Sequence, residues 1–185
     1  MRIILAITGA SGVIYGIRLL EELCRVGTEV HLVISRAAEK IICYETSYSL
    51  SDVKELAQES YDEHNVAAAL ASGSFQYDGA AIVPCSLKTL AAIAHGYTDN
   101  LITRMGVCAL KEGRKLIVVP RETPLDLASL RNLVALKEAG AIVLPAMPGL
   151  YHHPKSIDSL IDYVLGKILD QFDIQHQMFE RWDGD

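Results

Sequence analysis

The sequence is poor in several features that mark particular protein classes. Its 185 residues contain no apolar run of the roughly 20 residues that a membrane span needs, and aromatic residues make up only 6%. The opening MRIILAIT lacks the layout of a secretory signal. We therefore expect a cytoplasmic protein. The four cysteines are too scattered for a zinc site or a disulfide framework, and we expect reduced, mostly buried thiols at Cys24, Cys43, Cys85 and Cys108.

Charge and nucleotide motifs exclude further classes. The net charge is -6, and the basic residues are dispersed, so the chain has no electrostatic footprint for nucleic acid. It has no G-K-[ST] of a Walker loop, and its second apolar run ends in Ser35 and Arg36, without the carboxylate that holds a ribose in dinucleotide sites. A nicotinamide cofactor is disfavoured, and a small anionic ligand remains.

The sequence is rich in short runs of Val, Ile and Leu, each followed by an amphipathic stretch. This alternation is typical of a parallel sheet covered on both faces. We predict a three-layer, doubly wound α/β fold with a mainly parallel sheet, of the Rossmann or flavodoxin type. The α/β domain is expected over residues 1–175, with helices at the rim over 51–77 and a charged arm over 176–185. The strand runs are 2–8, 29–35, 79–85, 115–120 and 141–146.

Glycines and hydroxyls follow these runs where ligands bind in such sheets, beyond the carboxyl ends of the strands. The stretch TGASG leads from the first strand into a helix, and its free backbone N–H groups suit a phosphate. In PCSLKTL, Ser86 and Thr89 stand at another helix start. A lone serine there is more often a plain N-cap, but several such loops at neighbouring strand ends favour a ligand site.

Three other groups of residues have competing interpretations. Arg121 and Glu122 follow a buried strand, as a surface ion pair or as a phosphate ligand beside a proton-transfer group. Cys85 is interpreted as a buried residue and not a nucleophile, since no matching His and acid are evident. The adjacent His152 and His153 face different directions, which disfavours a metal site.

Seven motifs in order carry a family resemblance. They are TGASG, the ET of Glu45 and Thr46, PCSxKTLAAIAxG, NLITR, LKE, VPRETPL and PAMPxxYxxP, followed by a late helix with glycine, a base and ILD. Together they resemble the flavin prenyltransferases of the UbiX/Pad type, from Met1 to about Trp182. The number of motifs and their spacing make this resemblance specific.

The resemblance implies a metal-independent enzyme that joins a dimethylallyl group to N5 and then C6 of reduced FMN. The donor it implies is dimethylallyl monophosphate; the sequence does not decide between monophosphate and diphosphate. It also implies a homododecamer with sites between subunits, and a UbiD-type decarboxylase that receives the product.

The resemblance assigns roles to motif residues. Glu122, with Ser11 and Glu45, would handle protons and stabilise the migrating prenyl cation, and either Glu122 or the released phosphate would take the proton from C6. The phosphate of the prenyl donor would contact Arg104, Lys111, Tyr151 and Lys167, with Trp182 over the site. FMN would bind Gly9, Ala10, Ser11, Ser35, Ser86, Leu87, Lys88, Thr89 and Arg121.

Two positions depart from the family pattern. Lys167 stands where arginine is usual and offers a point charge in place of a bidentate fork. His153 stands where a basic residue is common. Two other functions remain open at this point: an FMN-dependent decarboxylase of the cysteine-decarboxylase type, which shares this architecture by resemblance, and a non-catalytic flavin carrier subunit of a decarboxylase.

Overall fold

The structure is a computed structural model, and it describes residues 1–182 and 184. Contacts between residues divide the chain into two compact units, Met1–Pro145 and Ala146–Asp185. The first unit contains the whole sheet, and the second contains the last helix and the tail. In the C-terminal arm expected over 176–185, residues 183 and 185 lie outside the described residues.

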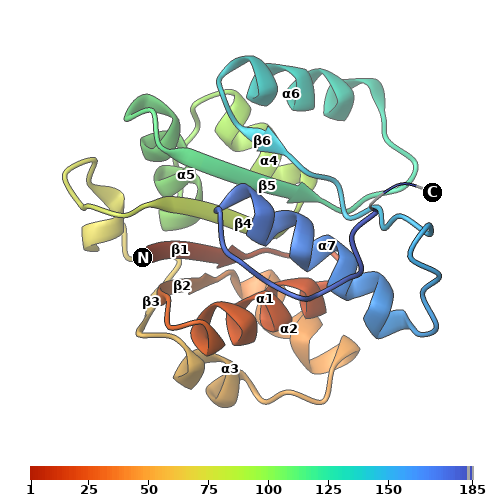
Figure 1. The fold of residues 1–185 in the computed structure, drawn as a ribbon. Coiled ribbons are helices and arrows are strands. Elements are labelled where there is room, and N and C mark those ends of the chain that lie inside the picture. Colours follow the sequence, from red (N-terminus) through yellow and green to blue (C-terminus); the bar gives the residue numbers. More distant parts are fainter. Residues whose placement is uncertain (183, 185) are drawn as a thin grey trace. The chain divides into compact units, whose positions relative to one another are not determined.

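The first unit is built on a six-stranded sheet in which every pairing is parallel (Figure 1). The strand order is β3-β2-β1-β4-β5-β6, so the order reverses between β1 and β4. The predicted doubly wound α/β fold is confirmed. The strands are β1 (Arg2–Ile7), β2 (Glu29–Ile34), β3 (Glu59–Asp62), β4 (Gly79–Cys85), β5 (Lys115–Pro120) and β6 (Ile142–Val143).

The helices of this unit form two groups that follow from the strand order. Because crossovers between parallel strands are right-handed, the reversal at β1 sends later helices to the opposite face of the sheet. In one group the helices contact one another; they are α1 (Val13–Arg25), α2 (Arg36–Glu45) and α3 (Leu50–Leu56). The other consists of α4 (Leu87–Ala94), α5 (Leu101–Lys111) and α6 (Leu127–Glu138).

Strand β1 supplies side chains to both layers of the core. All of its residues from Ile3 to Ile7 are fully buried, and Ile4 and Ala6 belong to the apolar cluster that includes the inward faces of α4 and α5. Ile7 points to the other side, where α1 approaches so closely that a Cβ on Gly16 would lie 2.2 Å from the Val83 carbonyl oxygen. The near-continuous apolar sequence of the strand is therefore the consequence of burial on both faces.

The segment 51–77 differs from its prediction as rim helices. It does begin within a helix, α3, and includes a short 3-10 turn, η1 (Ala69–Ala71), but it also supplies the edge strand β3. The sequence of β3, ESYD, has no apolar run, and three of its four residues are exposed. Polar contacts stabilise its pairing: Tyr61 Oη donates a hydrogen bond to Glu59 (2.6 Å) and lies 2.8 Å from Nδ1 of His31 on β2. Such a strand leaves no hydrophobic signal.

The second unit consists of the 146–156 loop, helix α7 (Ile157–Gln171) and the tail. Ser156 caps the helix by accepting a hydrogen bond from the Ser159 N–H, 3.1 Å away. Near its other end, the Asp170 carboxylate contacts three basic side chains, from Lys167, His176 and Arg181, at 3.5, 3.1 and 2.6 Å. In the described part of both units, every helix is too short or too polar to cross a membrane.

Candidate functional site

The reversal of strand order places the ends of β1 and β4 side by side, and the loops that follow them diverge. This is the position where open α/β sheets bind ligands. A cavity of about 380 Å³ lies here, a size within the range of small-molecule sites. It is lined by Gly9, Ser35, Ala37, Glu63, Ser86, Leu87, Lys88, Thr89, Asn100, Ile102 and Glu122. We call it the switch-point cavity.

The TGASG turn approaches this cavity but is less open than expected. Gly12 has φ of 94°, a conformation that favours glycine, and it precedes α1 without a side-chain cap. Its N–H donates to the Glu45 carboxylate, 2.7 Å away at the end of α2, and the Ala10 N–H donates to the Thr8 carbonyl. The prediction that this turn presents free N–H groups therefore holds for only part of it, because the chain's own carboxylate occupies one of them.

Helix starts with serine caps form the polar wall of the cavity. Ser35 caps α2 by accepting from the Ala38 N–H at 3.1 Å, and Ser86 caps α4 by accepting from the Thr89 N–H at 3.4 Å. The Ser86 hydroxyl also donates to Thr89 Oγ1 at 3.1 Å. The first amides of a helix have no partner within it, so the start of α4 presents the N–H groups of Leu87 and Lys88. The caps are structural, and they also give the cavity its donors.

Arg121 and Glu122 are neighbours in the loop after β5, but their side chains have different partners. The Arg121 guanidinium donates to the Ser11 carbonyl oxygen at 2.9 Å, which ties this loop to the TGASG turn. Glu122 is exposed, lines the switch-point cavity, and accepts a hydrogen bond from the Thr123 N–H at 3.1 Å. Within the described residues the two side chains form no ion pair with each other. The interpretation as a surface ion pair is therefore not supported.

Two of the residues predicted to bind the prenyl phosphate lie on α5 and point elsewhere in this structure. Arg104 Nε donates to the carbonyl of Ala71 at 3.1 Å, and Lys111 Nζ lies 3.0 Å from the Glu112 carboxylate. Neither is among the described residues that line the switch-point cavity. The cavity therefore brings Glu122 together with six of the nine residues predicted to bind FMN, but not with Ala10, Ser11 and Arg121, and not with these two bases.

The remaining predicted substrate residues all lie in the second unit. The ring of Tyr151 packs edge-on against Tyr163 and Trp182, and a cavity of about 230 Å³ is lined by Tyr151, Trp182 and residues beside them. Lys167 contacts Asp170 instead. Burial alone would raise the pKa of Asp170, but hydrogen bonds from Arg181 and His176 hold that pKa below its usual value. Asp170 is therefore a carboxylate that orients bases.

Among the lining residues that the sequence did not predict are two with polar side chains, Glu63 and Asn100. Both are buried, with exposed fractions of 8% and 6%. Asn100 is an N-cap, which the pattern N-x-x-T before an apolar stretch would have revealed. Glu63 follows the unpredicted strand β3, so no sequence pattern placed it at a strand end.

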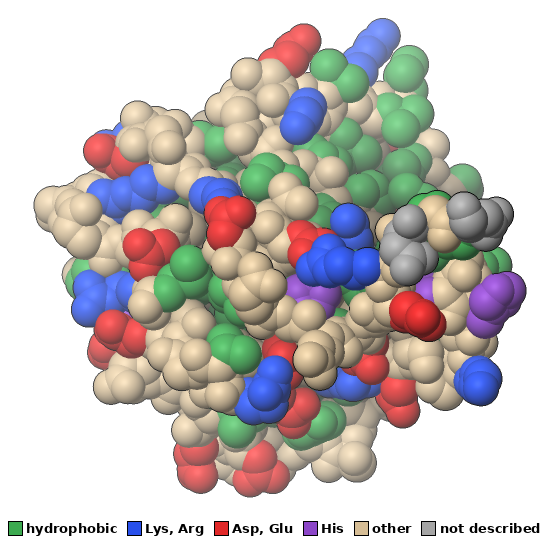
Figure 2. Space-filling view, viewed as in Figure 1, with side chains coloured by type: hydrophobic (Ala, Val, Ile, Leu, Met, Phe, Trp, Pro, Cys, Tyr) green, Lys and Arg blue, Asp and Glu red, His purple; other side chains and the backbone are tan. Residues whose placement is uncertain are grey.

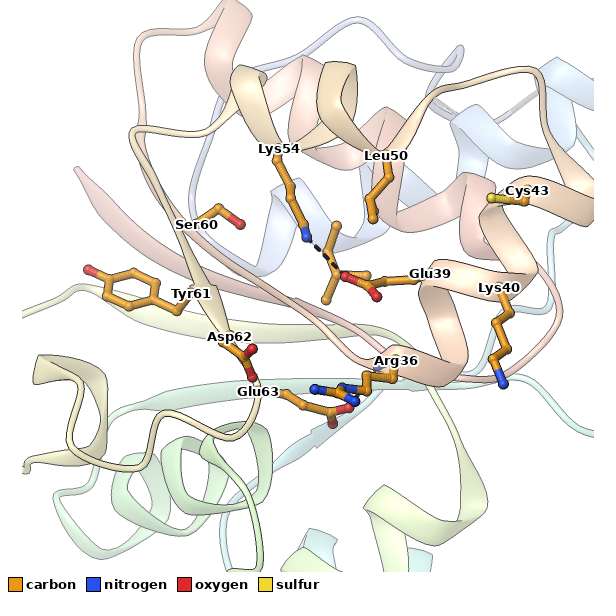
Figure 3. A pocket seen from close by; sticks show the side chains of 11 residues that line it. Arg36, Glu39, Lys40, Cys43, Leu50, Lys54, Ser60, Tyr61, Asp62 and Glu63 are labelled. Carbon is orange, nitrogen blue, oxygen red and sulfur yellow. Dashed lines mark hydrogen bonds and ion pairs between the residues drawn. The ribbon is translucent and has the colours of Figure 1, made fainter.

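A larger cavity, of about 590 Å³, lies on the other side of the first turn of α2 (Figure 3). We call it the α2–β3 cavity. An ion pair between Lys54 and Glu39, 2.9 Å apart, spans it, and Cys43 lies at its rim. Most of its lining comes from α2, α3 and the edge strand β3, and none of the residues predicted to bind FMN contributes to it. Glu63 lines both cavities.

The cysteine and histidine side chains were candidates for a nucleophile and for metal ligands. Cys85 is fully buried, and this burial raises the pKa of its thiol to about 12, which opposes a nucleophilic role. All four cysteines are free thiols, but only Cys85 and Cys108 are buried, and Cys43 is exposed. Among the described residues, no group of three or more His, Cys, Asp or Glu side chains is arranged to hold a metal ion.

Comparison with known proteins gives consistent results over the whole chain. A family model described as flavoprotein matches residues 1–182. The flavin prenyltransferase UbiX of Thauera aromatica is 50% identical over 184 residues, which cover 100% of this chain and 95% of the relative. The crystal structure of AnUbiX (PadA1) in complex with FMN and dimethylallyl pyrophosphate has a TM-score of 0.97 and 47% identity, covering 99% of this chain and 97% of that one.

A second similar solved structure is that of an oligomeric protein. It is that of a dodecameric FMN-dependent UbiX-like decarboxylase from Escherichia coli O157:H7, with a TM-score of 0.97 and 44% identity over 100% of both chains. The peptidyl-cysteine decarboxylase EpiD has a TM-score of 0.63 and 22% identity over 80% of this chain and 81% of its own. That likeness shows a shared fold alone.

Proposed function

This chain belongs to the flavoprotein family and, within it, to the flavin prenyltransferases, and we propose that it joins a dimethylallyl group to N5 and then C6 of reduced FMN. The observation that carries the proposal is the switch-point cavity, where the starts of α2 and α4 converge with the TGASG turn. Reduced FMN supplies the nucleophilic ring atoms that accept the prenyl group.

The residues present fit FMN. The flavin phosphate needs several donors, and the start of α4 offers two amides together with the hydroxyls of Ser86 and Thr89. Gly9 keeps the TGASG turn close to α2, since a Cβ there would lie 2.5 Å from that of Ala37. Ser35 adds a hydroxyl, and Arg121, already fixed by Ser11, adds a cation.

The prenyl phosphate is proposed to contact basic side chains. Loss of phosphate from an allylic carbon leaves an anion and a carbocation, so cations and a phenol are needed at the anion and π surfaces at the carbocation. Arg104 and Lys111 on α5, with Tyr151 and Lys167, are the candidates for the anion, and the Trp182 indole for the carbocation. The donor is proposed to be the monophosphate; AnUbiX is known in complex with the pyrophosphate.

Proton transfer is assigned to Glu122, the exposed carboxylate in the wall of the switch-point cavity. Glu45 has a different part, because its carboxylate already accepts from the Gly12 N–H and so fixes the turn that carries Ser11. Metal independence is part of the proposal, since cationic side chains take the role that a metal ion has in other prenyl transfers.

Assembly into a homododecamer is also proposed. The relative from Escherichia coli O157:H7 is dodecameric, and α6 of this chain exposes Leu127, Leu130 and Val134, by 62%, 45% and 57%. Figure 2 shows hydrophobic side chains gathered at the start of α6. An apolar helix face of this kind suits contact with another copy. The product, prenylated FMN, is proposed to pass to a UbiD-type decarboxylase.

The test is to incubate the protein anaerobically with reduced FMN and dimethylallyl monophosphate and to determine the mass of the flavin. A gain of one five-carbon prenyl unit supports the transferase. An unmodified but bound flavin contradicts it and leaves two alternatives. Release of carbon dioxide from a C-terminal cysteine peptide would then indicate a decarboxylase, and co-purification with a decarboxylase without turnover would indicate a carrier subunit.

A further inference from the structure

Glu63 is a buried carboxylate that the proposed chemistry does not use. It follows the edge strand β3, its side chain is 10% exposed, and it lines the switch-point cavity. A carboxylate is costly to bury unless its oxygens are hydrogen-bonded. The contacts that compensate this cost show how the side chain is oriented.

Two donors from different helix starts hold the carboxylate. The backbone N–H of Arg36, the first residue of α2, donates to Oε1 at 2.7 Å, and Nδ2 of Asn100 donates to Oε2 at 3.2 Å. Figure 3 shows the side chain of Glu63 beside Arg36. The Glu63 carbonyl also accepts from the Leu101 N–H at 2.7 Å. Glu63 thus joins β3 to the starts of α2 and α5.

The Asn100 amide cannot be turned to suit another partner. Its Oδ1 accepts from the Thr103 N–H at 2.9 Å in the cap of α5, so Nδ2 is the group that faces Glu63. Both hydrogen-bond partners of the carboxylate are therefore donors. Only a side chain with two acceptor oxygens satisfies both, and a glutamine would place its own NH₂ against a donor.

These contacts leave the two helix starts with different properties. At α2 the chain's own carboxylate occupies the first amide and Ser35 the third, whereas at α4 the first two amides remain for a ligand. A second anion is repelled from the Glu63 side of the cavity. Hydroxyl and N–H donors of a ligand are attracted there, because a carboxylate only accepts.

We propose that Glu63 is a flavin-positioning residue: its carboxylate accepts a hydrogen bond from a ribityl hydroxyl or the imide N–H of FMN, and directs the phosphate toward the start of α4. The proposal rests on the proposed function, because it takes the switch-point cavity as the flavin site. It adds Glu63 and its orienting partner Asn100 to the residues that the family pattern assigns.

Glu63→Gln tests the proposal through the dissociation constants of FMN and riboflavin, measured by quenching of flavin fluorescence. We expect both constants to rise by a similar factor, about tenfold, because a hydrogen bond to a charged group is lost on the part that both flavins share. A rise below about threefold for either flavin, or tighter binding of FMN, would overturn the proposal. If wild type binds no FMN, the proposed function itself fails.

Two further variants separate positioning from folding. Glu39→Gln makes the same chemical change on α2 in the other cavity, and its flavin affinities should equal those of wild type. Glu63→Asp keeps the charge but shortens the side chain by one methylene. If Glu63→Gln does not fold, the flavin dissociation constants are measured on Glu63→Asp instead. A purely structural role would lower the melting temperature of these Glu63 variants and leave flavin affinity of the folded protein unchanged.

Discussion

The two cavities on either side of the first turn of α2 differ in a way that volume does not predict. The α2–β3 cavity is the larger, at about 590 Å³ against about 380 Å³, yet its lining includes an internal ion pair and a mostly exposed edge strand. The switch-point cavity has hydroxyl caps, helix-start amides and a carboxylate at the reversal of strand order. The chemistry of the lining and its position in the topology indicate the functional site.

Among substitutions in the two cavities, Glu122→Gln should lower the rate of prenyl transfer most. Removing a general acid–base group typically lowers the rate by about 10²–10⁴-fold. We expect that loss in prenyl transfer, measured by the rate of prenylated flavin formation, with little change in FMN affinity. Asp62→Asn is the control, since Asp62 lines only the α2–β3 cavity. A rate for Glu122→Gln within threefold of wild type would remove this residue from the mechanism.

The buried Cys85 and the exposed Cys43 should differ strongly in reactivity. Burial raises the pKa of Cys85 to about 12, so very little of its thiol is ionised at pH 8.5, whereas about half of an ordinary exposed thiol is. We expect iodoacetamide to label Cys43, which is exposed at the α2–β3 cavity, and to spare Cys85 until the protein unfolds. Peptide mass spectrometry measures both. FMN should not protect Cys43, and protection would contradict the assignment of the cavities.

Two serine N-caps, one beside each cavity, separate an effect on stability from an effect on FMN binding. Ser35 caps α2 at the switch-point cavity, and Ser49 caps α3, which adjoins the α2–β3 cavity, each accepting an N–H at 3.1 Å. Replacing either by alanine should lower the free energy of unfolding by about 0.5–2 kcal/mol. Only Ser35→Ala should also raise the dissociation constant of FMN, by about tenfold, because a hydrogen bond to the phosphate is lost. Equal FMN affinities in the two variants would show that Ser35 is merely a cap.

The smallest effect is expected at the ion pair in the α2–β3 cavity. The side chains of Lys54 and Glu39 are 39% and 31% exposed, so solvent screens their attraction. Lys54→Met should change the free energy of unfolding by less than about 1 kcal/mol. It should leave the dissociation constant of FMN unchanged, as measured by fluorescence titration. A weakened FMN complex would give this cavity a part in flavin binding.

The parts of the fold with strong hydrophobic patterns were predictable, and the polar edge was not. Strand β1 is almost entirely apolar because both of its faces are covered, and this apolar run predicts a buried strand. Strand β3 pairs through backbone bonds at an edge, and its tyrosine and acidic side chains carry no period, so it was missed. Glu63 was missed with it, since a residue at a strand end is recognised only if the strand is.

The site shows the same division between local and distant information. Ser35 and Ser86 were identifiable because a cap lies next to the helix it starts. The hydrogen bond of Glu45 to Gly12 joins residues 33 positions apart and was invisible to local patterns, as was the Arg121 contact with Ser11. Motif order supplied Glu45 and Arg121 as site residues through the family resemblance, without the contacts that hold them.

Hydrogen exchange with and without FMN tests whether the switch-point cavity is the flavin site. We expect FMN to slow exchange of the backbone amides of Leu87 and Lys88 at the start of α4, while amides of α3 exchange at an unchanged rate. Mass spectrometry of peptides over 86–90 and 50–57 gives both values from one sample. Slowed exchange in α3, with no change at the start of α4, would place the flavin in the α2–β3 cavity and not in the switch-point cavity.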